Sequence, residues 1–148
     1  DQLREHWSCL GPDALTISSR QLGPALRDSR RPIKSALLDQ SLIAGVGNIY
    51  ADEALFAARI SPRRLSRSLD AGDVRRLAST IRRTLRDAIA LGGSTLRDYL
   101  DAAGNPGDYQ QQHRVYGRGG QPCRSCGSTL RQAVIAQRTT VWCPSCQR

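Results

Sequence analysis

The sequence of 148 residues contains a single lysine, no methionine and no long apolar run. No stretch approaches the roughly 18 consecutive apolar residues that a membrane-spanning helix needs. The N-terminus lacks the basic start and apolar middle of a secretory signal peptide. These absences predict a chain that neither spans a membrane nor carries a signal peptide. The missing initiator methionine is what a fragment or a processed form would show.

Positive charge is in excess and is almost entirely arginine. There are 22 basic and 13 acidic residues, which give a formal net charge of +9 and a pI near 10.2. A field of this sign favours polyanionic partners, either nucleic acid or an acidic membrane face. The guanidinium fork suits phosphates and base edges, which favours nucleic acid. A solvated arginine-rich surface is the alternative that composition leaves open.

Four of the five cysteines have the spacing of a metal site. The pairs Cys123/Cys126 and Cys143/Cys146 are each Cys-x-x-Cys, with sixteen residues between them. A hairpin brings such pairs together, and four thiolate ligands leave no position for water or substrate. We therefore predict one structural Zn²⁺, in preference to an iron–sulfur cluster, two disulfides or a redox dithiol. This spacing also indicates a reducing compartment, with Cys9 as a small hydrophobic residue.

The pattern along the chain predicts a mainly α fold followed by a small zinc-bound β-hairpin. Apolar periodicity and turn residues place helices at residues 2–10, 19–27, from 32, from about 48 to before 61, and 71–91. A polar stretch at 99–114 reads as a loop or hinge. Short β-prone runs follow at 133–136 and 139–142. We expect two domains, a helical one over 1–112 and a zinc finger over 113–148.

Two further features suit an anion. Gly45-Val-Gly47-Asn48 precedes a helix, and Asn48 is a good N-cap there, so the N–H groups of the first turn make a phosphate site. A tight interhelical turn with a capping asparagine is the alternative. Arg138 lies near the expected hairpin turn, where it can reach a groove or a phosphate.

Taken in order, these pieces resemble the C-terminal half of the Fpg/Nei family of base-excision DNA glycosylases, and the Fpg branch more closely than the Nei branch. The resemblance covers nearly the whole chain. It rests on Leu10-Gly-Pro-Asp-Ala-Leu15, Ile33-Lys34, Leu38-Asp-Gln40, Ile43-Ala-Gly-Val-Gly-Asn-Ile-Tyr-Ala-Asp-Glu-Ala-Leu-Phe56, Gly93-Ser-Thr-Leu96, Val115-Tyr-Gly-Arg118, Gly120-Gln-Pro-Cys123 and Gln137-Arg-Thr-Thr140.

The resemblance implies a helix-two-turn-helix bundle before the zinc finger, and a set of DNA contacts. Asn48, beside Gly47, and Arg138 would clamp the phosphates that flank a damaged nucleotide. Lys34 would lie on the DNA side, and Tyr116 would be a further backbone contact. The loop around 104–109 is similar to the segment that closes over the flipped base. The implied partner is double-stranded DNA with a damaged base or abasic site, bound by a monomer in the bacterial cytosol.

The resemblance also implies catalytic residues that this sequence does not show. The family attacks the sugar with an N-terminal proline amine beside a glutamate, whereas this chain opens with Asp1-Gln2. We expect the chain as given to bind DNA without excising bases, as part of a glycosylase/AP lyase for oxidised purines. Two alternatives stay open: the same region of a pyrimidine-directed Nei enzyme, and a stand-alone zinc module that binds nucleic acid.

Overall fold

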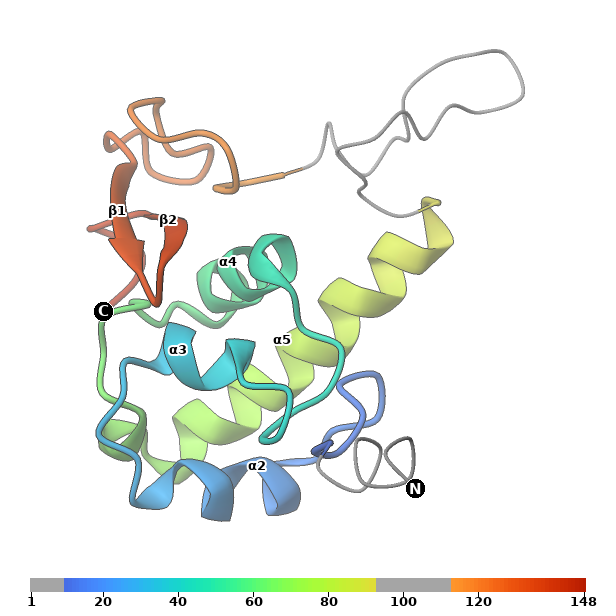
Figure 1. Ribbon diagram of the computed structural model, residues 1–148. Helices are drawn as coiled ribbons and strands as arrows, with labels where there is room; N and C mark the ends of the chain where they lie inside the picture. Colours follow the sequence, from blue (N-terminus) through green and yellow to red (C-terminus); the bar gives the residue numbers. More distant parts are fainter. Residues whose placement is uncertain (1–9, 93–112) are drawn as a thin grey trace.

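The computed structural model describes residues 10–92 and 113–148, as a helical bundle with a small hairpin beside it (Figure 1). Its elements are α2 (Ser19–Arg27), α3 (Ile33–Leu38), α4 (Asn48–Ala58), the short 3₁₀ helix η1 (Ser66–Ser68), α5 (Ala71–Ala90), β1 (Arg131–Ile135) and β2 (Arg138–Trp142). The predicted mainly α class is confirmed. Of the helix expected at 2–10 and the loop expected at 99–114, residues 2–9 and 99–112 lie outside the described residues.

Local sequence explains where the two amphipathic helices begin. Ser18 and Asp70 each cap a helix, α2 and α5 respectively, and in each case the third helical residue returns a hydrogen bond to the cap backbone. The apolar residues that repeat along α5 form a buried stripe, in which Leu77, Ile81 and Leu85 are no more than 7% exposed, whereas Ile89 near its end is 65% exposed. Burial of that stripe against α4 and α2 holds the bundle together.

Helix α4 lies at the centre of the described structure and is buried on most sides. It packs against α3, α5 and β2 (Figure 1). Because its surroundings leave little solvent-facing surface, even its acidic residues are enclosed: Asp52 is 1% and Glu53 is 6% exposed. Buried carboxylates need partners, and both find them in the zinc-finger region.

The hairpin turns in two residues. β1 and β2 pair antiparallel with Ile135 opposite Arg138, and the turn residues Ala136 and Gln137 both have positive φ, 53° and 62°. This is the geometry of a type I′ turn, which matches the twist of the two strands. The turn therefore fixes Arg138 as the first residue of β2.

A second small core joins the zinc-finger region to the bundle. Phe56 of α4 packs with Val115, Leu130 and Val141, next to the buried Cys123 and Cys143. This core crosses the domain boundary expected at residue 112, because its largest side chain comes from α4. None of the helices in the described ranges is long and apolar enough to cross a membrane.

Candidate metal centre and nucleic-acid interface

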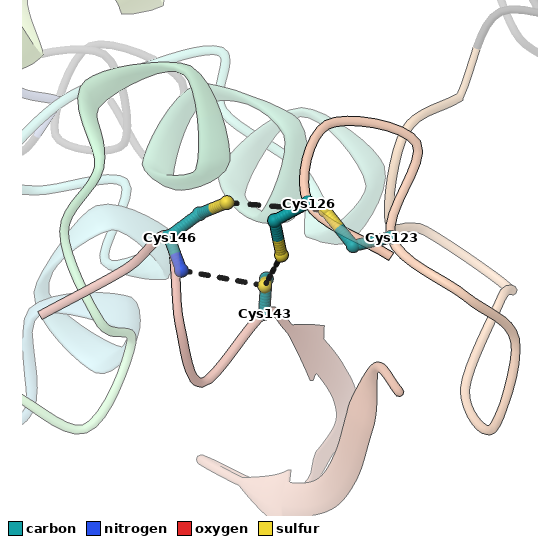
Figure 2. Close-up of side chains that lie close together, drawn as sticks. All are labelled: Cys123, Cys126, Cys143 and Cys146. Atoms are coloured by element: carbon teal, nitrogen blue, oxygen red, sulfur yellow. Dashed lines mark hydrogen bonds between the residues drawn. The ribbon is translucent and has the colours of Figure 1, made fainter. Parts of the chain in front are cut away.

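The four predicted cysteine ligands converge at one point (Figure 2). Their Sγ atoms all lie within 4.8 Å of one another, with Cys123 and Cys146 3.9 Å apart and Cys126 and Cys143 3.4 Å apart. Zn–S bonds of about 2.3 Å in a tetrahedron put sulfurs roughly 3.8 Å apart. The cluster therefore fits one structural Zn²⁺ with four thiolate ligands.

The surroundings shift the pKa values of three of the thiols, and in different directions. Hydrogen bonds from Ser128 lower the pKa of Cys126 to about 6, whereas burial, with hydrogen bonds among the thiols, raises the pKa of Cys146 to about 12. Burial also raises the pKa of Cys143. The backbone N–H of Cys146 donates to the Cys143 Sγ (3.3 Å), as in a metal knuckle. Zinc binds the thiolate form of cysteine, so its binding displaces thiol protons and depends on pH.

The start of α4 differs from the sequence expectation by one residue. Gly47, not Asn48, is the N-cap, and within the part of the chain that the structure describes this end of the helix has no side-chain cap. Asn48 is the first helical residue, and its Nδ2 donates to the carbonyl of Thr139 in β2 (3.1 Å). Its Oδ1 is buried and has no hydrogen-bond partner among the described residues. The asparagine thus bridges to the hairpin and leaves the first turn of α4 uncapped.

Four of the five residues expected to contact DNA lie around one surface region. Asn48 and Arg138 line two adjoining hollows, of about 570 and 520 Å³. Gly47 lines the first and Tyr116 the second. Arg138 is exposed. An uncapped helix N-terminus beside an exposed guanidinium is an arrangement that suits an anion.

The fifth residue, Lys34, is enclosed. It is 0% exposed, forms an ion pair with Asp52, and donates to the Thr140 Oγ1 (3.0 Å). The other Asp52 oxygen accepts the backbone N–H of Val141 (3.2 Å). In this geometry the ammonium faces the interior between α3, α4 and β2, and a direct contact with a ligand would require it to leave the pair.

Burial shifts both members of this pair toward neutrality. It lowers the pKa of Lys34, against the opposing effect of Asp52, and it raises the pKa of Asp52 to about 6, against the opposing effect of Lys34. Arg138 is the first residue of β2, and its positive charge also lowers the pKa of Lys34. The charge of β2 is therefore coupled to the buried pair in the bundle.

Sequence reasoning missed Glu53. Its carboxylate accepts three backbone N–H groups, from Arg114 (2.8 Å), Val115 (2.9 Å) and Tyr116 (3.0 Å). It thereby fixes the segment that carries Tyr116. The available signal was an Asp-Glu pair inside the otherwise apolar helix Asn48–Ala58, since adjacent acids on a buried helix require partners.

Besides the Lys34–Asp52 pair and Glu53, a third contact joins the zinc-finger region to the bundle, close to Cys143 and Cys146. Gln147 donates from Nε2 to the carbonyl of Ile60 (3.0 Å) and accepts the backbone N–H of Cys143 (2.8 Å). Ser61 and Arg148 also pair through the backbone (3.1 Å). The zinc knuckle is therefore anchored to the chain that leaves α4.

Comparison with known proteins gives this arrangement a context. Residues 10–99 match the "Formamidopyrimidine-DNA glycosylase H2TH domain", and residues 120–148 match the "Zinc finger found in FPG and IleRS". The chain is 51% identical over 142 residues to a formamidopyrimidine-DNA glycosylase of Thermus thermophilus, and 49% identical over 140 residues to one of Desulfitobacterium hafniense. Each alignment covers 93% of this chain and 53% or 51% of the relative.

Solved structures agree. The crystal structure of MutM (Fpg) from Thermus thermophilus superposes with a TM-score of 0.85 at 50% identity, over 94% of this chain and 54% of that one. Lactococcus lactis Fpg in complex with abasic-site DNA superposes with a TM-score of 0.88 at 37% identity, over 100% of this chain and 56% of that one. The chain spans about half the length of these relatives. It belongs to the Fpg/MutM family, of which it represents the C-terminal H2TH domain and zinc finger.

Proposed function

We propose that this chain is the damaged-DNA-binding region of a bifunctional base-excision-repair DNA glycosylase/AP lyase that acts on oxidised purines. Support comes from the sequence identity of about 50% between this chain and formamidopyrimidine-DNA glycosylases. Structural relatives with abasic-site DNA and with DNA containing carbocyclic 8-oxo-G add to this. The observation in this chain that carries the proposal is the meeting of Asn48 and Arg138 at one surface.

Asn48 and Arg138 form a clamp for two phosphates of one DNA strand. The N-terminus of α4 has a partial positive charge and, among the described residues, no side-chain cap. Arg138 adds a full charge in the adjoining hollow, where its fork can hold phosphate oxygens. Gly47 has no side chain, and even a Cβ at this position would meet nothing within 4 Å, so there is room for the strand to approach. Tyr116, half-buried in the second hollow, extends the contact along the backbone.

Lys34 supports this clamp from behind. Its ammonium holds Thr140 directly, and its partner Asp52 holds Val141, so both act on the strand that begins with Arg138. We assign Lys34 a positioning role, as part of the DNA interface without a direct contact.

Clamped phosphates serve excision because a base in a duplex must leave the stack before chemistry can reach it. Phosphate contacts carry no sequence information, but they fix the register and hold the kinked backbone that allows extrusion. The zinc holds the hairpin and takes no part in the reaction.

The clamp is tested by fluorescence anisotropy with a duplex that contains an abasic-site analogue. Asn48→Ala and Arg138→Ala should each weaken binding by about 1–3 kcal/mol, the cost of losing a hydrogen bond to a charged group. The matched control is Arg131→Ala, an exposed arginine at the far end of β1. Unchanged affinity in both clamp variants would refute the clamp. A steep fall of affinity with salt is also expected.

The substrate class is tested with the longer protein, in which the upstream half that the relatives possess is present. It should release 8-oxoguanine and formamidopyrimidines from duplex DNA and cleave the strand at the resulting site. Preferential release of oxidised pyrimidines would instead assign the protein to the Nei type. Absence of any upstream coding region would favour a stand-alone binding module.

A further inference from the structure

An apolar hollow with an arginine rim lies between α2, η1 and the start of α5. Its volume is about 470 Å³. The floor is formed by Leu26 and Val74, which are 1% and 8% exposed, and by Leu69. In Figure 1, α2 lies at the bottom of the view and the hairpin at the upper left, with α3 between them. The hollow is thus separate from the Asn48–Arg138 site.

The face of α2 that lines the hollow has small residues at its centre, because Gly23 and Pro24 lie between Arg20 and Arg27. Gly23, in the middle of α2, faces Val74, and a Cβ at this position would lie 3.8 Å from the Val74 Cγ1, an ordinary contact. Pro24 follows it, and Ser19, Ser66 and Ala71 are the other short residues of the lining. A glycine inside a helix costs about 1 kcal/mol relative to alanine. Its presence here leaves space that a larger residue would fill.

The rim has positive charge that the described chain does not neutralise. Arg20 and Arg27 come from α2, Arg67 from η1 and Arg75 from α5, and all four are exposed. Within residues 10–92 and 113–148 none of these guanidinium groups has an ion pair or a hydrogen bond. The one acidic residue of the lining, Asp70, uses its Oδ1 to accept the N–H of Asp73 (2.8 Å) as the cap of α5.

Neighbouring arginines differ in this respect. Arg64 and Arg76 both pair with Asp73 at 2.8 Å, and Arg31 pairs with Asp39 at 3.0 Å. Among the described residues, acidic side chains therefore pair with arginines close to the hollow and with none of the four that surround it. Acidic side chains of another molecule would form the corresponding ion pairs with these four arginines.

We propose that this hollow is a docking site for an acidic peptide segment of a partner protein, with one apolar side chain of the segment inserted between α2 and α5. Carboxylates match the guanidinium forks of the rim, and the floor offers a place to bury an apolar anchor. A DNA backbone would satisfy the rim, but it has no apolar group to fill the hollow, so the floor favours a peptide. The docking site is independent of the proposed function.

The test measures binding of the 148-residue, zinc-loaded chain to a fluorescein-labelled peptide, Asp-Glu-Asp-Glu-Leu-Phe, by anisotropy at low salt. Arg20→Glu/Arg75→Glu should weaken binding at least about tenfold, because two attractive pairs become repulsive. Arg83→Glu/Arg86→Glu is the matched control, with the same change in net charge on exposed residues further along α5. It should change binding less than about threefold, the effect of general charge alone. Gly23→Leu keeps all four arginines and fills the hollow, so it should weaken binding as well. Circular dichroism confirms that each variant is folded.

Four kinds of outcome would overturn the proposal. The first is no binding by the unmodified chain, or equal weakening by the control pair. The second is unchanged affinity when Leu-Phe in the peptide is replaced by Ser-Ser. The third is displacement of the peptide by duplex DNA together with a loss of duplex affinity in Arg20→Glu/Arg75→Glu, which would assign the rim to nucleic acid. The fourth is loss of peptide binding in the longer protein, which would mean that the rest of the polypeptide covers the hollow.

Discussion

Lys34 and Asp52 form an ion pair that is closed to solvent, with side chains 0% and 1% exposed. The only lysine of the sequence is thus used inside the protein, at the junction of α3, α4 and β2. Because each charge depends on the other, removal of one partner has a different effect from removal of both.

Lys34→Met should destabilise the chain by about 3–5 kcal/mol, because it leaves the Asp52 carboxylate buried and unpaired. Lys34→Met/Asp52→Asn should recover at least half of that loss. The neutral amide removes the buried charge, and its oxygen can still accept the N–H of Val141. Urea unfolding followed by circular dichroism measures both values. If the double variant were less stable than Lys34→Met, the unpaired charge would not be the cause.

Asp52 should also give the chain a pH-dependent stability. Its pKa is raised from 3.8 to about 6 by burial, with Glu53 adding to the rise and Lys34 opposing it. The folded state therefore holds this proton more tightly than the unfolded state. The contribution of Asp52 to stability is then greatest at low pH and falls as the pH rises from about 4 to about 6. The free energy of unfolding of the wild type minus that of Asp52→Asn should decrease over this range. A flat difference would contradict the raised pKa.

Glu53→Gln should loosen the segment that carries Tyr116 at a cost of about 1–3 kcal/mol. A glutamine keeps one accepting oxygen and turns an NH₂ group toward at least one of the three backbone N–H groups that the carboxylate accepts. Hydrogen exchange at Arg114, Val115 and Tyr116 should accelerate. Asp87→Asn, on the exposed face of α5, removes the same charge and should leave these amides protected.

Residues that readily adopt positive φ should make the hairpin turn, and so the chain, more stable. Ala136 and Gln137 both have positive φ, which costs an ordinary L-residue about 1–2 kcal/mol. Ala136→Asn/Gln137→Gly should therefore raise stability by roughly 1–2 kcal/mol, since Asn-Gly is the preferred type I′ pair. The opposite sign is expected for Gly127→Ala, where φ is 79°. Thermal unfolding of the zinc-loaded chain checks both signs, and a destabilised Asn-Gly variant would argue against the turn assignment.

Zinc removal should disorder more than the hairpin. The second core shares Phe56 with α4, and Gln147 ties the knuckle to Ile60. Chelation should accelerate hydrogen exchange at the amides of β1 and β2. It should also accelerate exchange at the amide of Ser61, which donates to the carbonyl of Arg148. Most helical circular dichroism should remain, because α2, α3 and α5 have their own core. Unchanged protection of β1 and β2 after metal loss would show that zinc does not hold the hairpin.

The sequence alone determined the features that depend on local spacing. The two Cys-x-x-Cys pairs predicted the metal cluster, the stripe of Leu77, Ile81 and Leu85 predicted α5, and the run of motifs predicted the family. Each of these patterns lies within a short stretch or repeats at the period of a helix, so it can be read without knowledge of the fold. The start of α4 was misplaced by one residue, since the Asn48 side chain pairs with a strand 91 residues away and not with its own helix.

The tertiary structure decided what the buried polar residues do. Lys34 and Thr140 are 106 residues apart in sequence, and Glu53 lies 61 to 63 residues from the amides that it accepts. No local pattern gives such pairings, because they arise only when α4 is enclosed by α3, α5 and the zinc-finger region. Enclosure removes water as a partner and obliges each buried polar group to find another. For this reason Lys34, which the family resemblance placed on the DNA side, is buried in an ion pair with Asp52, whereas Arg138 is exposed.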